Sequence, residues 1–339
     1  MRVSIVGAGL QCRRRGPSVK AVEGAKLVSI SSLHREHAEA AARSFGAEVD
    51  EDWRVTVGRE DVDVVFVCTP PGSHAEISMA AMRAGKHVLC EKPLSRTLEE
   101  AEAMVGVARE TGRVLKCGFN HRHHPAIWEA HRRLREGDLG EPMFARCRYG
   151  ICGRPGYEKE WRADPAEAAG GQFIEQGTHA MDLFRWFLGD LVEVACMTSI
   201  HYFKEQAMDD GGMAMFRSAR GATASLHTSL TQWKNLFSFE VFGTEGYIQA
   251  EGLGGGYGTE TLAIGRRDFK APFQDHVIHY RGGDGSWEAE WKEMAGAIAE
   301  GRRPIGDGLD GLEAMRIGLT AYEAERRKAT LSIPHGEAG

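Results

Sequence analysis

One helical segment carries three polar side chains whose types and spacing could do chemistry. The segment GGQFIEQGTHAMDLFRWFLGD spans residues 170–190. At about 100° per residue, Glu175, His179 and Asp182 fall within an arc of roughly 60°. The opposite side is apolar, with Met181, Leu183, Phe184, Phe187 and Leu188. An imidazole one turn from a carboxylate can exchange a proton with a hydroxyl near neutral pH. In isolation the pattern also fits a core histidine paired to a carboxylate, or a mixed metal site.

A lysine forms a second candidate. The run HVLC is typical of a buried strand, and it leads directly into the motif CEKPL, which places Glu91 and Lys92 at the end of that strand. An ammonium group at the carboxyl end of a parallel strand can donate to a substrate oxygen or relay its proton. Taken alone, Lys92 could equally be an ordinary surface lysine.

The elements around this lysine alternate between strand and helix. Strands are predicted at 3–7, 27–31, 62–68, 87–91 and 113–119, and the helical patterns between them cover 35–45, 74–85 and 95–112. This alternation predicts an α/β domain with a doubly wound parallel sheet, which binds its ligands at the carboxyl ends of the strands.

The first strand runs into a glycine turn. In VSIVGAGLQC, Gly7 allows a tight turn and Gly9 lets the backbone approach a pyrophosphate, which the following helix N-terminus can hold. Cys12 stands where a third glycine is expected, and a side chain of this size can still pack against the strand. The basic run Arg13–Arg15 could add phosphate contacts or could be a solvated helix face. The sequence therefore predicts a dinucleotide site at the start of the chain.

The end of the second strand bears on the choice of dinucleotide. An acidic residue here usually binds the 2′-hydroxyl of NAD, whereas a 2′-phosphate favours hydroxyls and cations. The sequence has Ser31, Ser32, His34 and Arg35 at this place. NADP is therefore favoured over NAD.

The pattern changes after residue 120. Beyond a helical stretch at 126–140, strands are predicted at 142–152, 193–203, 213–218, 222–230, 235–243 and 246–252, with short turns between several of them. A C-terminal helix at about 308–328 and a short strand close the chain. We expect two domains, a Rossmann dinucleotide-binding domain at 1–120 and an α+β domain for substrate binding and oligomerisation at 121–339, built on a large, mostly antiparallel open sheet.

Composition excludes several classes of protein. The 339 residues are 42% hydrophobic and 27% charged, which is typical of a globular protein. The longest apolar runs are strand-sized, so no membrane segment or export signal is expected. A formal charge of −6 argues against a nucleic-acid partner. The seven cysteines form no CxxC pair, so we expect buried, reduced thiols and no zinc site. Because no export signal is expected, we expect a cytoplasmic location.

Taken together, these motifs resemble the family of glucose-fructose oxidoreductase, inositol dehydrogenase and rhizopine catabolism proteins (Gfo/Idh/MocA). The resemblance covers nearly the whole chain and depends on GAGLQC, CTPPGSHAE, CEKPL, GFNHRHHPA, WRAD and GGQFIEQGTHAMD in the family's order. It implies a nicotinamide-dependent oxidoreductase that acts mostly on sugars or cyclitols.

The resemblance also implies roles for single residues. Lys92 and His179 would be catalytic, with His179 taking a proton from a secondary alcohol as the carbon gives hydride to nicotinamide C4. Substrate contacts are expected at Glu175, Arg122, Tyr157 and Asp182. The residues expected to contact the cofactor are Gly7, Gly9, Leu10, Cys12, Ser32, Arg35, Thr69, Pro70, Pro71, His74, Glu91, Asn120, Trp161 and Arg162. The family usually has aspartate where this chain has Glu175, and it implies no metal.

Several alternatives remain open at this stage. Asp182 could be structural and pair with Arg185. Acidic residues in the loop GYEKEWRADPAE would suit a cationic aminosugar, or they could simply face water. The leading hypothesis is an NAD(P)-dependent dehydrogenase or ketoreductase of a sugar, aminosugar, sugar nucleotide or cyclitol. The alternatives are a non-catalytic dinucleotide sensor and a reductase of a dihydrodiol, imine or tetrapyrrole. An open sheet commonly associates, so we expect a homodimer or homotetramer.

Overall fold

A computed structural model describes residues 1–270 and 274–334. The chain divides into two compact units. The first contains Met1–Asn120, Ala166–Ala169 and Trp287–Met315, and the second contains His121–Pro165, Gly170–Ser286 and Arg316–Gly339. The first unit therefore ends its main segment at Asn120 but takes in two later segments that the sequence analysis assigned to the second domain.

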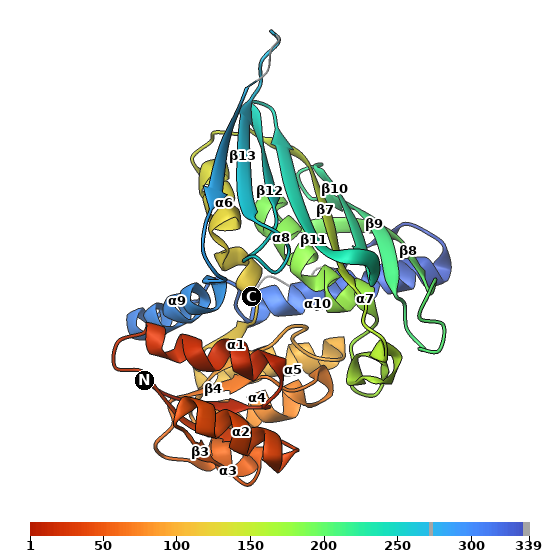
Figure 1. Ribbon diagram of the computed structural model, residues 1–339. Coiled ribbons are helices and arrows are strands. Elements are labelled where there is room, and N and C mark those ends of the chain that lie inside the picture. The colour runs from red at the N-terminus through yellow and green to blue at the C-terminus, as the bar shows by residue number, and fades with distance from the viewer. Residues whose placement is uncertain (271–273, 335–339) are drawn as a thin grey trace. The chain divides into compact units, whose positions relative to one another are not determined.

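The first unit is built on a six-stranded parallel sheet with strand order β3-β2-β1-β4-β5-β6. Figure 1 labels β3 and β4 of this sheet, together with several of the unit's helices. Its strands are β1 (Arg2–Val6), β2 (Lys26–Ser31), β3 (Glu48–Val49), β4 (Val64–Val67), β5 (His87–Cys90) and β6 (Leu115–Cys117). Its helices are α1 (Leu10–Ser18), α2 (Arg35–Phe45), α3 (Trp53–Gly58), α4 (His74–Arg83), α5 (Leu98–Thr111) and α9 (Ser286–Glu300). The predicted doubly wound parallel sheet is confirmed.

Local sequence explains where these helices begin and end. Thr97 and Glu100 form a reciprocal capping box at the start of α5. The side chain of Asp52 accepts hydrogen bonds from two backbone amides of α3. Gly46 ends α2 in the left-handed conformation. These signals make the helix ends largely local properties of the sequence.

The core of this unit also uses the late segment of the chain. The ring of Trp291, on α9, lies 5.1 Å from that of Phe66 on β4 in an edge-on contact. Trp291 is fully buried and donates a hydrogen bond to the carbonyl oxygen of Val19. Helix α9 therefore completes the hydrophobic core over β1 and β4, a role that the sequence pattern did not predict.

The second unit is built on a nine-stranded sheet with order β14-β13-β12-β11-β7-β10-β9-β8-β15. Its strands are β7 (Pro142–Cys152), β8 (Leu191–Ser199), β9 (Gly211–Ser218), β10 (Thr223–Ser229), β11 (Thr231–Gly243), β12 (Gly246–Glu251), β13 (Glu260–Arg266), β14 (Asp275–Tyr280) and β15 (Leu331–Ser332). All neighbouring pairs are antiparallel except β7 with β10. The mostly antiparallel sheet is confirmed.

Helices cover one face of this sheet. They are α6 (Pro125–Arg135), α7 (Gln172–Glu175) and α8 (Gly177–Leu188). The later part of α10 (Gly308–Arg327) belongs to the same unit, where Gly318 lies against Ile174 of α7 and Met181 of α8. The short 3-10 turns are η3 (Asn120–His123), η4 (Tyr157–Lys159) and η5 (Trp161–Ala163). Phe184 of α8 packs near Phe216 of β9 and Phe239 of β11, with ring centroids 5.9 Å apart in both pairs. These contacts bury the apolar side of α8 that the sequence pattern predicted.

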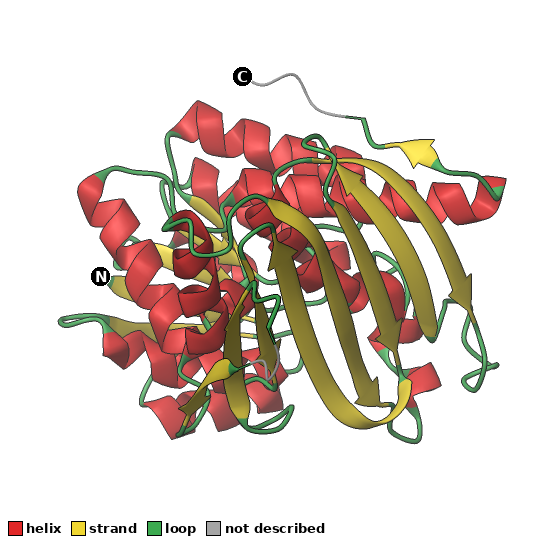
Figure 2. Ribbon diagram, turned by 90° about the horizontal axis from the view of Figure 1, so that it is seen from above, coloured by secondary structure: helices red, strands yellow, loops and turns green. Residues whose placement is uncertain are grey.

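The other face of the sheet is open. Figure 2 shows its long strands with no helix in front of them. Met197, Met213 and Met215 on this face are 60–76% exposed. A hollow of about 1040 Å³ lies over β7, β8, β9 and β10.

Several elements differ from the prediction. The helix expected over 170–190 is divided at Gln176 into α7 and α8. Strand β3, helix α3, strands β13 and β14 and helix α9 were not foreseen. The glycine-rich stretch 251–260 is largely a loop, and β13 begins at its last residue.

All seven cysteines are free thiols, and all except Cys152 are buried. Within the described residues, no helix combines the length and apolar character that a membrane span requires.

Candidate active site

The glycine turn after β1 has the geometry of a phosphate cradle. Gly7 has φ +100°, and a Cβ atom there would lie 2.7 Å from the carbonyl carbon and oxygen of Cys68, so only glycine fits. A Cβ on Gly9 would meet nothing within 4 Å. Gly9 is also the N-cap of α1 and makes no side-chain capping bond. Open space before uncapped amides at the positive end of a helix fits the pyrophosphate of a dinucleotide.

The two residues that follow this turn have different surroundings. Leu10 is exposed at the start of α1, where it can contact a ligand at the turn. Cys12 is buried in the core, and burial raises the pKa of its thiol to about 11. The neutral thiol therefore packs where a third glycine was expected. A direct contact between Cys12 and the cofactor stays a prediction.

Arg15 corrects one expectation of the sequence analysis. Its side chain is fully buried, so it neither reaches a phosphate from the surface nor lies on a solvated helix face. Its Nε donates to Glu91 at 2.5 Å and its Nη1 to Glu290 at 2.8 Å. Burial alone would lower the pKa of Arg15, but the charges of both carboxylates outweigh it and raise the pKa. Only Arg13 and Arg14 of the basic run are exposed.

The same ion pairs define the position of Glu91. Its carboxylate is bound to α1 through Arg15, while its backbone follows β5 and leads into Lys92. Lys116 lies 3.9 Å from Glu290 and 3.6 Å from Glu293, so this buried network extends to β6. These contacts favour a positioning role for Glu91, holding the Lys92 strand end against the helix of the glycine turn.

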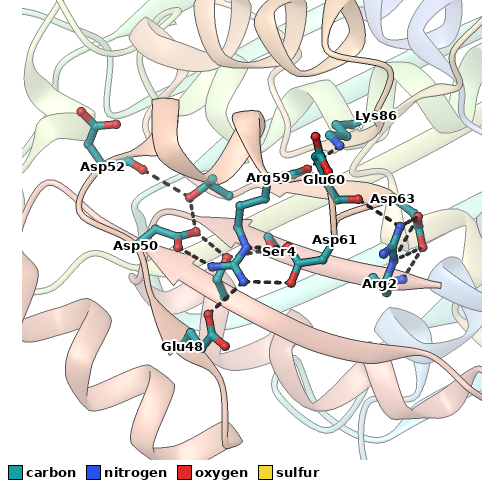
Figure 3. A network of polar contacts seen from close by, with 12 residues as sticks. Arg2, Ser4, Glu48, Asp50, Asp52, Arg59, Glu60, Asp61, Asp63 and Lys86 are labelled. Carbon is teal, nitrogen blue, oxygen red and sulfur yellow. Dashed lines mark hydrogen bonds and ion pairs between the residues drawn. The ribbon is translucent and has the colours of Figure 1, made fainter.

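The end of β2 is supported by a second polar network, which Figure 3 shows. Asp50 accepts hydrogen bonds from Ser29 at 2.5 Å and from Arg59 at 2.9 Å. The Thr56 hydroxyl lies 2.9 Å from both Asp50 Oδ2 and Ser31 Oγ. The Ser31 hydroxyl is therefore hydrogen-bonded within the unit.

The residues beyond Ser31 lie closer to the surface. Ser32 is partly exposed, and His34 and Arg35 are exposed. The Arg35 guanidinium pairs with Glu39 one turn later, at 3.0 Å, on the surface of α2. Because surface pairs of this kind are weak, Arg35 can still bind an incoming phosphate. Ser32, His34 and Arg35 are thus the accessible groups of the four that suggested NADP.

The loops after β4 and β5 are joined by a buried histidine. The ring nitrogens of His74 lie 2.8 Å from the carbonyl oxygen of Thr69 and 3.0 Å from that of Pro93. Burial lowers the pKa of His74, so the ring stays neutral near pH 7. Pro71 is buried beside it, whereas Thr69, Pro70 and Lys92 are partly exposed. The edge of the sheet therefore gathers the glycine turn, the Thr69 loop and Lys92.

In the second unit, the polar stripe of α8 faces the 3-10 turn η3. His179 stacks on His121, with ring centroids 3.7 Å apart and planes 23° apart. Arg122 binds Asp182 through two bonds of 2.8 and 2.5 Å, and both side chains are buried. Its guanidinium also lies over the ring of Trp186. The stripe that suggested a ligand is thus largely covered by residues of the same unit.

The Arg122–Asp182 pair bears on two of the predicted substrate contacts. Its two bonds occupy both groups inside the unit, which favours a structural role, so substrate contacts at Arg122 and Asp182 stay predictions. The pairing of Asp182 suggested by the sequence was with Arg185, and the structure gives Arg185 an ion pair with Asp190 at 2.9 Å.

Glu175 lies at the end of α7 beside the WRAD motif. Its carboxylate is 3.3 Å from the Nε of Arg162, whose Nη1 is 3.3 Å from Glu160. The Arg162 guanidinium covers the ring of Trp161 at 4.3 Å. Glu175, Trp161 and Arg162 are therefore brought together within this unit, as a shared ligand surface requires.

Tyr157 is buried near Glu175 and Arg162. It packs against Phe203 and Leu230, and burial, with Glu175 nearby, raises the pKa of its hydroxyl. This position favours packing, and a substrate contact at Tyr157 stays a prediction. Asn120 is buried at the last position of the first unit's main segment.

Sequence reasoning missed one residue in each unit, Arg15 as a buried cation in the first and His121 as the ring stacked on His179 in the second. For His121 a signal existed, since the run HRHH places it beside the predicted Arg122. For Arg15 the partner Glu290 lies 275 residues away, and no local pattern joins them. Within residues 1–270 and 274–334, no cluster of three or more His, Cys, Asp or Glu side chains could hold a metal ion.

Comparison with known proteins gives matches over almost the whole chain. A family model described as an oxidoreductase family with an NAD-binding Rossmann fold matches residues 1–119, and the Gfo/Idh/MocA C-terminal domain matches residues 127–249. The chain is 32% identical to 1,5-anhydro-D-fructose reductase of Ensifer adhaerens, covering 99% of each. It is 29% identical to scyllo-inositol 2-dehydrogenase (NAD(+)) of Bacillus subtilis, covering 91% of this chain and 89% of that protein.

A solved structure of levoglucosan dehydrogenase, in complex with NADH and L-sorbose, superposes with a TM-score of 0.90 at 26% identity and covers 99% of both chains. Both domain matches, the identity to the anhydrofructose reductase and the two observed sheets agree with the motifs. The chain belongs to the Gfo/Idh/MocA family of NAD-binding oxidoreductases.

Proposed function

We propose that this protein is an NAD(P)-dependent dehydrogenase or ketoreductase acting on a CH–OH group of a sugar, aminosugar, sugar nucleotide or cyclitol. The observation that carries the proposal is the edge of the six-stranded sheet, where the Gly7–Gly9 turn, the Thr69 loop and Lys92 come together. Such an edge is where doubly wound sheets bind dinucleotides.

The proposed reaction has a simple balance. A secondary alcohol loses a hydride from carbon and a proton from oxygen and becomes a ketone, and bound nicotinamide supplies the hydride acceptor at its C4. In this proposal His179 accepts the proton, Lys92 donates a hydrogen bond to the substrate oxygen, and Glu175 binds neighbouring hydroxyls. In reduction the same residues act in reverse, with His179 returning the proton.

The substrate class is supported by the relatives and by the acids near α7. The relatives carry the names of anhydrofructose, inositol and levoglucosan enzymes, and carboxylates such as Glu175 suit hydroxyl-rich ligands. A specific preference for a cationic aminosugar has weaker support, because Glu160 already pairs with Arg154 at 2.7 Å and with Arg162.

The direct test follows the reduced coenzyme by its absorbance at 340 nm. Oxidation is assayed with NAD⁺ or NADP⁺ and a panel of sugars, aminosugars and cyclitols. Reduction is assayed with NADH or NADPH and the corresponding ketoses and osones. We expect turnover on at least one polyol or its keto form. Coenzyme binding without turnover on the panel would favour a dinucleotide sensor. Turnover confined to dihydrodiols or imines would favour the non-sugar reductase.

We also propose that NADP is preferred over NAD, with Ser32 and Arg35 binding the 2′-phosphate. Replacing Arg35 with Ala should lower kcat/KM for NADP⁺ by about tenfold, because one charge-assisted contact is lost, and should leave the value for NAD⁺ within about twofold. Initial rates at a fixed substrate concentration, with the concentration of each coenzyme varied, measure both kcat/KM values. Arg43→Ala, near the other end of α2, is the control. Equal losses with both coenzymes would contradict this role for Arg35.

The open face of the nine-stranded sheet is proposed as the contact between subunits. Its exposed methionines, Met197, Met213 and Met215, form an apolar strip, and charged residues such as Arg146, Glu240 and Lys328 lie around the same hollow. An apolar strip with charged residues of both signs beside it suits a second copy of the same surface.

Charges placed on this strip should separate the subunits. We expect Met213→Glu/Met215→Glu to convert a dimer or tetramer into a smaller species, because each apolar contact would become a buried charge. Light scattering after gel filtration measures the mass. Val55→Glu, an exposed position on α3, should not change it. An unchanged mass in the double variant would place the subunit contact elsewhere.

The free cysteines bear on the compartment. All seven are thiols, which suits the reducing conditions of a cytoplasm. We therefore retain a cytoplasmic location as part of the proposal.

A further inference from the structure

The stacked rings of His121 and His179 suggest a role that neither the motifs nor the relatives assign. His121 comes from η3 and His179 from α8, so two elements 58 residues apart meet through two imidazoles. The rings are 5% and 4% exposed. We propose that His121 is a positioning residue for the base, and that the two rings share one proton as a linked pair. This proposal rests on the proposed role of His179.

Contacts on several sides hold the His121 and His179 rings in place. At a centroid distance of 3.7 Å, one face of the His179 ring is closed by His121. His121 is itself held from the other sides, by Tyr149 of β7 at 5.2 Å and by Phe237 of β11 at 5.5 Å. The His179 ring therefore rests against a wall formed by His121 of η3, which is itself packed on the sheet. Such a wall fixes the plane from which the imidazole can accept a proton, and small displacements of a catalytic group cost large factors in rate.

The close stacking limits the positive charge that the two imidazoles can carry. Two buried rings this close cannot both become cationic without strong repulsion, so binding of one proton opposes binding of the next. A neutral ring, in contrast, can lie face to face with a cationic one. The pair is therefore suited to hold a single proton, the one that leaves the substrate hydroxyl.

The surroundings of the pair decide how that proton is balanced. The titratable groups around it include His124, whose ring lies 5.7 Å from that of His121, and Tyr149 of β7, which also contacts Tyr257. Glu175 precedes His179 by four residues. His124 is bound to Glu260 at 3.1 Å and lies 3.8 Å from Asp284. Glu175 is bound to Arg162, and the Arg122–Asp182 pair is compensated within itself. Glu260, Glu175 and Asp182 are therefore each paired within the unit, with His124, Arg162 and Arg122.

Two substitutions of His121 distinguish the effect of its aromatic face from the effect of its titratable nitrogens. His121→Phe keeps an aromatic face but cannot titrate, and His121→Ala removes the face. We expect kcat of His121→Phe to stay within about fivefold of wild type at high pH. We expect kcat of His121→Ala to fall by about 10- to 100-fold, with the substrate KM changed less than threefold.

The matched control is His131→Phe. His131 also stacks on an aromatic ring of α8, that of Trp186, with centroids 3.6 Å apart, and it is not part of the proposed site. The His131→Phe substitution should leave kcat and its pH profile unchanged. If His121→Ala behaves like this control, or if His121→Phe loses as much activity as His121→Ala, the positioning role is overturned.

The shared proton is tested without catalysis. NMR titration of histidine-labelled protein should show the His121 and His179 signals shifting together over the first protonation, with a second step at clearly lower pH. In His121→Phe, His179 should show one simple step. Independent, superimposable titrations of the two rings in wild type would overturn the linked pair. Because this readout needs no substrate, it distinguishes failure of this inference from failure of the proposed enzymatic activity.

Discussion

Replacing His179 with Ala should lower kcat by about 10² to 10⁴-fold, the contribution that a positioned proton acceptor typically makes. The ring is buried on α8 and is stacked on His121. Coenzyme affinity should change by less than threefold, because the glycine turn that would bind the pyrophosphate lies in the other unit. Stopped-flow hydride transfer and coenzyme fluorescence titration measure the two quantities separately.

His227→Ala is the control for this variant. His227 lies on β10 and lines the open face of the sheet, away from α8, and its loss should leave kcat within about twofold. The His179→Ala variant must show the wild-type circular dichroism spectrum for the comparison to count. Turnover within a few fold of wild type in a folded His179→Ala protein would remove His179 from the reaction.

The second large effect is expected at Lys92. Lys92→Met keeps the length of the side chain but removes the ammonium group, so kcat should fall by about 10²-fold or more as the hydrogen bond to the reacting oxygen is lost. The double variant Lys92→Met/His179→Ala should be little slower than the slower single variant, because residues that act on one proton transfer are not additive.

The test is a double-mutant cycle that compares the single-turnover rates of the wild type, the two single variants and the double variant. Lys20→Met, an exposed lysine of the first unit, is the matched control. Multiplicative losses in the double variant would mean that Lys92 and His179 contribute independently of each other. A Lys92→Met protein with unchanged kcat and a raised coenzyme KM would make Lys92 a coenzyme ligand only.

The sequence was most informative where structure is local. Helix α2 spans Arg35–Phe45 as predicted, and β7 spans Pro142–Cys152 as predicted. Both have a clear period and clear end signals, such as Gly46 after α2. Periodicity and turn chemistry were sufficient there, because the contacts that fix the ends of these elements lie within a few residues.

Prediction failed where long-range contacts decide the outcome. Helix α9 was missed, although Trp291 is central to the core, because its burial depends on strands more than 200 residues earlier. The division of the predicted helix at Gln176 also escaped the pattern. Gln172 donates to Gln176 at 2.5 Å, and Asp209, far along the chain, binds the amide of Phe173. Such partners bend a helix without changing its hydrophobic period.

The candidate site shows the same division. The motifs located the glycine turn, Lys92 and His179, but the partners of charged residues were assigned from neighbouring sequence. Arg15 was therefore expected at the surface and is buried. For Asp182 a pairing with Arg185 was one alternative, and the structure binds Asp182 to Arg122. A pairing between distant segments depends on the fold as a whole, and spacing along the chain does not encode it.

The buried ions around Arg15 have a consequence for fragments of this protein. Two carboxylates, Glu91 and Glu290, balance one guanidinium, and Glu290 arrives from the last quarter of the chain. A gene truncated after codon 120 would expose the pocket that Trp291 fills and deprive Arg15 of half its counter-charge. The nucleotide-binding half is thus not a detachable module, and grafting it into a chimera would require transplanting α9 with it.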